Sequence, residues 1–208
     1  NNRRERDMSL IFKLLRKLYG NIIYYRYSKR IKDLIRRGLT VGKNVTIEHT
    51  VMIDTNYPYL IKIGNNCSLA QGVKLLAHDA TPFKFLNGHT RLGKIEIKDN
   101  VFIGTDVIIL PGVTIGPNVL IAAGSVINKD IPPNSCVAGV PARFYKKFDE
   151  FLNEIHKEID ERPVFELNEL RRKIKDEKQL NKVRNAVDDG IAFIKGFEGV
   201  YRYTLNQE

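Results

Sequence analysis

The feature that most constrains the fold of this chain is an aliphatic residue that recurs at every sixth position through its middle. Three phased stretches carry it: Val41, Ile47, Ile53; Ile63, Leu69, Leu75; and Ile97, Ile103, Ile109, Ile115, Ile121, Ile127. A period of six matches neither an α-helix nor a plain strand. A segment that keeps this period must turn a corner at each repeat, and three such faces close one 18-residue coil of a triangular prism. The repeat therefore predicts a parallel β-helix over residues 39–144, with the aliphatic side chains inside.

Two insertions interrupt the repeat. Four residues are added around 59–62, and sixteen are added as a loop over 81–96. A long excursion from a regular scaffold is more often functional than accidental. We therefore expect the chemistry of the chain to lie near the longer loop.

Helical segments are expected before and after the prism. The chain therefore divides into residues 1–38, 39–144 and 145–208. Residues 8–37 have apolar side chains at three- and four-residue spacing, and Gly38 is suited to end a helix there. Beyond 145 the repeat is lost. The pattern predicts helices over 145–161 and 166–188, separated by Arg162-Pro163, and we expect this extension to cap the open end of the prism.

Nearly all of the net charge of +10 lies in the first segment. Residues 1–37 hold twelve Lys/Arg and three Asp/Glu, whereas the rest of the chain holds 22 and 21. One interpretation is that the apolar stripe of 8–37 packs on the first coil and leaves the bases solvated. The other is that this basic amphipathic helix docks on the cytoplasmic face of an anionic membrane. Nucleic acid is not an expected partner, because the bases follow one helix and no recognised nucleic-acid module is present.

Little in the sequence points to an oxidising compartment or a membrane span. Cys67 and Cys136 make no disulfide framework, and both are expected to fill the core. The apolar run after Met8 is broken at Lys13, too early for a secretory signal. Residues 107–128 lack charge, but their Pro and Gly fit the repeat rather than a span. We expect a cytoplasmic protein.

Residues 39–143 resemble the hexapeptide-repeat acyltransferases. Within these they are most similar to the sugar O-acetyltransferases of the galactoside and maltose type, and to those of capsule and lipopolysaccharide assembly. The motifs that carry the resemblance stand in this order: His-Asp-Ala-Thr (78–81), Ile-Gly-Thr-Asp (103–106), Leu-Pro-Gly-Val (110–113), Ala-Gly-Ser-Val (123–126), Lys-Asp-Ile-Pro (129–132) and Gly-Val-Pro-Ala-Arg (139–143). The resemblance implies a left-handed winding, acetyl-CoA as co-substrate, a sugar acceptor and a homotrimer with sites between subunits.

A base is needed to transfer an acetyl group from a thioester to a hydroxyl, and histidine titrates near neutrality. His78 stands at the mouth of the longer loop and matches the family's catalytic histidine. The resemblance implies that His78 takes the acceptor's proton and that no acyl-enzyme forms. Asp79 beside it either orients the ring or lies in solvent.

Three further residues are candidates for acceptor binding. His49 and Asp54 lie on an early coil, where relatives hold the acceptor, although this stretch departs from the galactoside enzyme's acceptor motif. His89 lies inside the loop, where it is either solvated or meets a ligand at a neighbouring subunit's site.

The coenzyme is an extended polyanion with a thin pantetheine arm, which needs small side chains along its path. The resemblance implies that Thr105 and Ala123 contact this arm, and that Lys129 and Arg143 meet the adenosine phosphates by charge.

Four other functions of such a prism can be compared with the residues of this chain. An N-acetyltransferase of a nucleotide-linked amino sugar would use the same base, so the residues do not exclude it. Serine acetyltransferases carry a glycine-rich stretch after their histidine, where this chain has Asp-Ala-Thr-Pro. A zinc hydratase of the γ-carbonic anhydrase type needs three converging imidazoles, and the close histidine pair of that family is missing, so no metal is expected. A non-catalytic scaffold would have no reason to combine His78 with the coenzyme residues.

Overall fold

The computed structural model describes Leu18, Ile22 and residues 25–168, 177–188, 190–196 and 204–205. The chain divides into two compact units. One comprises residues up to Tyr145 together with Tyr203–Glu208, and the other comprises Lys146–Arg202.

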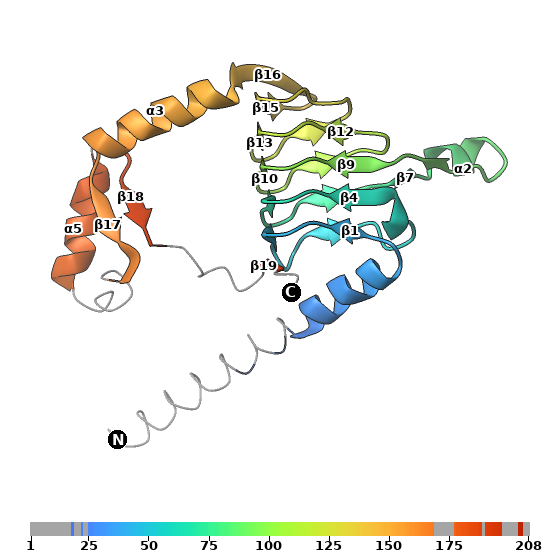
Figure 1. The fold of residues 1–208 in the computed structure, drawn as a ribbon, viewed down its shortest axis with the longest axis horizontal. Helices are drawn as coiled ribbons and strands as arrows, with labels where there is room; N and C mark the ends of the chain where they lie inside the picture. Colours follow the sequence, from blue (N-terminus) through green and yellow to red (C-terminus); the bar gives the residue numbers. More distant parts are fainter. Residues whose placement is uncertain are drawn as a thin grey trace. The chain divides into compact units, whose positions relative to one another are not determined.

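The first unit is a prism of three sheets, which successive coils cross in a constant order (Figure 1). The first sheet contains β1 (Thr40–Val41), β4 (Ile61–Ile63), β9 (Ile95–Ile97) and β12 (Thr114–Ile115). The second sheet contains β2 (Val45–Ile47), β5 (Ser68–Leu69), β10 (Val101–Ile103), β13 (Val119–Ile121), β15 (Ser135–Gly139) and β16 (Ala142–Lys147), with β19 (Thr204–Leu205) antiparallel to β2. The third sheet contains β3 (Met52–Ile53), β6 (Lys74–Leu75), β11 (Ile108–Ile109) and β14 (Val126–Ile127).

The register of neighbouring strands confirms the 18-residue coil. Ile103 pairs with Ile121, and Ile109 pairs with Ile127, in parallel ladders. Each six-period residue therefore stacks on the equivalent residue of the next coil, which produces columns of aliphatic side chains along the prism.

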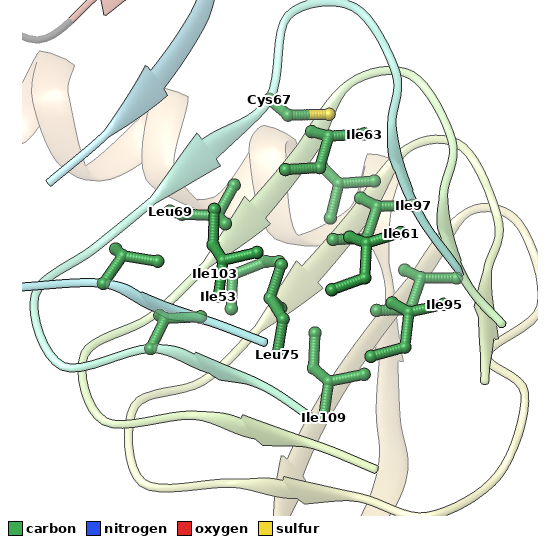
Figure 2. Close-up of a cluster of buried hydrophobic side chains, with 14 of the residues drawn as sticks. Ile53, Ile61, Ile63, Cys67, Leu69, Leu75, Ile95, Ile97, Ile103 and Ile109 are labelled. Atoms are coloured by element: carbon green, nitrogen blue, oxygen red, sulfur yellow. The ribbon is translucent and has the colours of Figure 1, made fainter. Parts of the chain in front are cut away.

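The interior is aliphatic, as the repeat predicts. All twelve six-period residues are at most 5% exposed, and Figure 2 shows several of them converging within the prism. Ile61 and Ile95 add two further buried positions in the first sheet. Most residues four positions after the six-period ones are buried as well, but Tyr57 and Asp79 are not, because the chain leaves the prism there, just before each insertion. Burial of this apolar surface is the main stabilising contribution to such a fold.

The corner between the first and second sheets is built on asparagine. Asn44, Asn66, Asn100 and Asn118 all have positive φ, from 53° to 58°, which asparagine tolerates better than most residues. Their side chains form a ladder along the prism, in which each amide donates to the next over 3.1–3.2 Å. This ladder holds successive coils in register at one edge.

The N-terminal helix caps the first coil through its second half. Residues 25–36 are helical, and Tyr27, Ile31 and Leu34 on one face are buried. The Tyr27 hydroxyl donates to the Ile47 carbonyl over 2.6 Å, which ties the helix to β2. Gly38 ends this segment with a φ of 103°, as expected.

The apolar stripe of residues 8–37, which the capping interpretation placed against the prism, is not the face that packs there. Of that stripe, Leu18 and Ile22 are exposed by 57% and 47%, and the residues before Leu18 lie outside the described part of the chain. The cap is therefore made by a different face, and part of the stripe is not covered by the prism.

The second unit differs in part from its predicted helices. The helix α3 (Phe148–Glu161) starts three residues later than expected, because β16 extends to Lys147. The prediction of a helix from 166 is wrong at its start, since Glu166 ends the strand β17 (Val164–Glu166). This strand pairs in parallel with β18 (Phe193–Lys195), and Phe165 is 7% exposed. A strand partner almost thirty residues away overrides the local helical pattern. The helix α5 (Glu177–Asp188) agrees with the prediction.

Within the described residues, no helix is long and apolar enough to cross a membrane. The uncharged stretch 107–128 forms strands and turns of the prism, so its rejection as a span is confirmed.

Candidate active site

Both insertions leave the prism at the same edge. This edge, where the third sheet leads into the first, contains residues 54–60, 76–94, 110–113 and 128–130, and is called the insertion edge below. The shorter insertion forms the 3-10 turn η1 (Pro58–Leu60). The longer one forms an arm, in which β7 (His78–Asp79) and β8 (Arg91–Leu92) pair antiparallel and α2 (Thr81–Phe85) lies beyond them (Figure 1).

A buried carboxylate holds the ring of His78 at the base of this arm. Oδ2 of Asp54 contacts Nδ1 of His78 and accepts a hydrogen bond from the backbone of Ala77 over 3.0 Å. Asp54 comes from the coil below, directly after β3, and is 6% exposed.

The other oxygen of this carboxylate is occupied by backbone donors. Oδ1 of Asp54 accepts from the amides of Asn56 and Tyr57 over 3.0 and 3.3 Å. A buried carboxylate with this many donors has a fixed orientation. Its contact with Nδ1 favours the tautomer of His78 that carries a proton there, which leaves Nε2 with the free lone pair.

The ring of His78 is also supported by an aromatic contact. The Tyr57 ring lies edge-on to it, with centroids 5.3 Å apart and an interplanar angle of 64°. The His78 side chain retains 30% of its exposure. The ring is thus held on two sides yet open to a ligand, which is the arrangement a general base needs.

Asp79 makes its hydrogen bond to Thr81 and not to the His78 ring. Its Oδ1 accepts from the Thr81 amide over 2.9 Å and closes the turn that leads into α2. The hydrogen bonds from the Thr81 side chain and backbone lower the pKa of Asp79, with a smaller contribution from Arg91. Asp54, which we expected to bind the acceptor, takes the orienting position instead.

The remaining histidine candidates lie away from His78. His49 is at the corner between the second and third sheets, a different edge of the prism, where it lines a hollow with Arg26 and Arg30. His89 lies beyond α2 in the arm, where its ring contacts the Leu86 carbonyl. The structure therefore does not bring them together with His78 in one chain. Among the described residues, no group of three or more His, Cys, Asp or Glu side chains is placed to hold a metal ion.

The candidate coenzyme residues fall into two pairs. Thr105 and Ala123 stack at the corner between the second and third sheets, where the Gly124 amide donates to the Thr105 carbonyl over 2.8 Å. Lys129 and Arg143 line one hollow, and Lys129 lies on the insertion edge. In one chain, the third sheet therefore separates Thr105 and Ala123 from His78 and Lys129.

The outer face of this third sheet is largely apolar. Met52, Ile108 and Val126 point outward from it, together with Lys74, and Met52 is 47% exposed. A further hollow lies on the outer face of the first sheet, beside Lys62, Glu96 and Thr114. That hollow contains none of the candidate residues.

Sequence reasoning found His78 but missed its pairing with Asp54. The four-residue insertion lengthens that coil, so Ile53 pairs with Leu75, 22 positions on. Counting this longer coil places residues 54 and 78 at the same corner, which is the signal that could have revealed the pair.

Known proteins resemble part of this chain. The bacterial transferase hexapeptide (six repeats) family profile matches residues 94–129. A putative acetyltransferase of Bacillus subtilis, YvoF, is 33% identical over 122 residues, which cover 59% of this chain and 68% of the relative. The galactoside O-acetyltransferase of Escherichia coli is 38% identical over 62% of this chain and 59% of its own length.

A putative acetyltransferase of Schizosaccharomyces pombe is 47% identical over 43% of this chain, but this match spans only 44% of the relative. Among solved structures, a galactoside acetyltransferase in complex with coenzyme A is 31% identical, with a TM-score of 0.49, over 65% of this chain and 82% of that one.

Proposed function

Because this chain belongs to the hexapeptide-repeat acetyltransferase family, with its left-handed parallel β-helix, we propose that it transfers an acetyl group from acetyl-CoA to a sugar hydroxyl. The observation that carries this proposal is the pair Asp54–His78 at the edge where both insertions lie. A histidine whose Nδ1 is held by a buried carboxylate presents Nε2 as a base.

The reaction follows from this arrangement. Nε2 of His78 takes the proton of the acceptor hydroxyl as the oxygen attacks the thioester carbonyl. The C–S bond then breaks, the acetyl ester forms, and the proton on His78 passes to the leaving thiolate. Asp54 stabilises the charged ring between these two steps.

The coenzyme is proposed to lie between two copies of the chain. Lys129 and Arg143 line one hollow and are both exposed, which suits contact with phosphates. Thr105 and Ala123 lie at the other border of the third sheet, beside an outer face that is apolar. A neighbouring copy that covers this face would bring its own Thr105 and Ala123 towards His78, and closed threefold symmetry would repeat the site three times.

The acceptor is proposed to be a saccharide of a surface polysaccharide, such as a capsule or O-antigen. Support comes from the similarity to the galactoside O-acetyltransferase of Escherichia coli. The saccharide units of such polysaccharides are assembled on the cytoplasmic side of a membrane, so we propose that the protein acts there.

A direct experiment tests the reaction. The purified protein is incubated with acetyl-CoA and a panel of glycosides, amino sugars and serine, and free thiol is followed. We expect release with glycosides and a loss of about 10²–10⁴-fold in His78→Ala. The matched control is His156→Ala, because His156 is an exposed histidine of α3. Turnover with amino sugars alone would favour N-acetylation, and turnover that survives in His78→Ala would reject the base.

The N-terminal segment is proposed to contact an anionic membrane. Its prism-facing side is used by Tyr27, Ile31 and Leu34, whereas Leu18, Ile22 and most bases of residues 25–37 are exposed. Exposed apolar and basic side chains suit a lipid headgroup layer. The full chain should sediment with anionic vesicles at low salt and not with neutral ones, and a chain without residues 1–19 should lose this binding and keep its activity. If the full chain ignores anionic vesicles, the segment serves as a cap only.

A further inference from the structure

The shorter insertion presents a tyrosine ring that the fold itself does not use. Pro58 is buried and Leu60 is half-buried, so they anchor η1 against the prism. Between them, Tyr59 is 60% exposed. A large aromatic ring left in solvent beside a candidate active site contributes little to folding, and it is available to a ligand.

The backbone of Tyr59 is nevertheless held tightly. It packs on Gly38, the glycine that ends the N-terminal helix with a φ of 103°. A Cβ added to Gly38 would lie 2.7 Å from Cβ of Tyr59 and 3.2 Å from its Cα, so this approach admits only glycine. The helix end and the insertion therefore fix the position from which the ring projects.

A chain of ring contacts links Tyr59 to the base. The Tyr59 ring meets Tyr57 edge-on at 6.3 Å with an angle of 79°, and Tyr57 meets His78 edge-on at 5.3 Å. Tyr59 thus lies one aromatic ring further from the reacting position than Tyr57 does. A ligand group that touches Tyr59 is next to the reacting sugar and is not that sugar itself.

We propose that Tyr59 binds a second saccharide unit of the acceptor, adjacent to the unit that is acetylated. This inference rests on the proposed function and deepens it, since it names a di- or oligosaccharide as the acceptor class. The C–H face of a pyranose packs on the face of an aromatic ring, while its hydroxyls stay in water. An exposed, anchored ring provides such a platform with little loss of conformational freedom on binding.

The test compares acceptors of two lengths. Acetylation of methyl β-galactoside and of lactose, and of methyl α-glucoside and of maltose, is measured for the wild type, Tyr59→Ala and Tyr59→Phe. In the wild type, kcat/KM should favour the disaccharide of each accepted pair. Tyr59→Ala should lower kcat/KM for that disaccharide about 3- to 10-fold and change the monosaccharide by less than twofold. Tyr59→Phe, which keeps the ring, should retain the preference.

The control is Tyr25→Ala, because Tyr25 is similarly exposed, at 65%, but lies on the N-terminal helix. An unchanged length preference in Tyr59→Ala, or an equal loss on both lengths, overturns the inference and leaves the acetyltransferase proposal standing. A wild type that acetylates amines and no glycoside rejects the sugar acceptor itself, and the inference with it. If Tyr59→Ala unfolds, Tyr59→Leu gives the same comparison, because it removes the aromatic face and keeps apolar bulk.

Discussion

Oδ2 of Asp54 contacts Nδ1 of His78 across two successive coils, although the residues are 24 positions apart. The carboxylate is buried and takes three backbone hydrogen bonds besides this contact. Such a carboxylate is oriented before any substrate binds, so folding supplies the free energy that is needed to orient the His78 ring.

Replacement of this carboxylate tests its role. Asp54→Asn should lower kcat about 10²–10⁴-fold, because an amide can hold His78 in the wrong tautomer. The KM for acetyl-CoA should change by less than threefold, since Asp54 is not expected to touch the coenzyme. The matched control is Asp79→Asn, a half-buried neighbour whose carboxylate bonds to Thr81, which should retain turnover within about threefold. A large loss in Asp79→Asn with a mild effect of Asp54→Asn would reverse the assignment.

A shared site predicts complementation between two inactive variants. Light scattering should give about 72 kDa, three times the chain's 23.9 kDa. His78→Ala lacks the base, and Ala123→Trp should block the coenzyme path, so each alone is expected to be inactive. Trimers refolded from an equal mixture should regain about a quarter of wild-type activity, because one site in four then pairs an intact His78 with a neighbour's intact Ala123.

A site built within one chain would show no recovery in that mixture. An active monomer would contradict the assembly outright. Unmixed samples of each variant, refolded in the same way, provide the baseline.

Lys129 and Arg143, which line one hollow, should affect the binding of the coenzyme and not of the acceptor. Lys129→Ala and Arg143→Ala should each raise the KM for acetyl-CoA about 5- to 30-fold, as the loss of a charged phosphate contact does. This increase in the KM for acetyl-CoA should be smaller at high salt, where exposed charges are screened. Lys43→Ala is the control, because Lys43 is an exposed lysine at another edge of the prism. An unchanged coenzyme KM in both variants places the coenzyme elsewhere.

The buried thiol of Cys67 predicts a loss of stability in alkali. Burial raises the pKa of this thiol from 9.0 to about 11, since the thiolate would be desolvated. The folded state then binds the proton more tightly than the unfolded state does. The contribution to stability is complete below pH 9.0 and is lost as the pH rises through about 11. Urea titrations from pH 8 to 11 should show a steeper decline for the wild type than for Cys67→Ala, and parallel curves would contradict this origin.

The asparagine corner predicts a difference between two substitutions of Asn100. Its side chain donates to Asn118 and accepts from Asn66, and its φ is 58°. Both Asn100→Gly and Asn100→Ala lose the hydrogen bonds, but alanine keeps a β-carbon, which is disfavoured in left-handed backbone, whereas glycine has none. Alanine should therefore lower the free energy of unfolding by about 1–2 kcal/mol more than glycine does. Equal losses of the free energy of unfolding would show that the hydrogen-bond ladder, and not the left-handed backbone, accounts for asparagine at this position.

Within the prism, the sequence alone predicted most of the buried positions, with Ile61 and Ile95 among those it missed. Val41, Ile47 and the rest of the twelve could be assigned because the neighbours of each residue in a coil lie at constant offsets along the chain. The same regularity placed Thr105 beneath Ala123 and His78 at the mouth of the arm. It also made Cys67 an inward residue, which is confirmed.

Outside the repeat, tertiary structure decided what the local pattern could not. Glu166 forms a strand because β18 lies beside it, and the N-terminal helix packs through Tyr27 rather than through Leu18. In both cases two faces or two conformations were open to the segment, and a partner distant in sequence selected one.

The candidate site was predicted in part from the sequence and decided in part by the tertiary structure. The sequence by itself determined that the chain is a hexapeptide prism with His78 beside a long insertion, because those properties follow from a repeat whose contacts have constant spacing. Only the tertiary structure decided that Asp54, and not Asp79, holds His78, and that the third sheet separates His78 from Thr105 and Ala123. The physical reason is that an insertion has no period: its path, and the side chains that it brings together, depend on packing against residues far away in the chain.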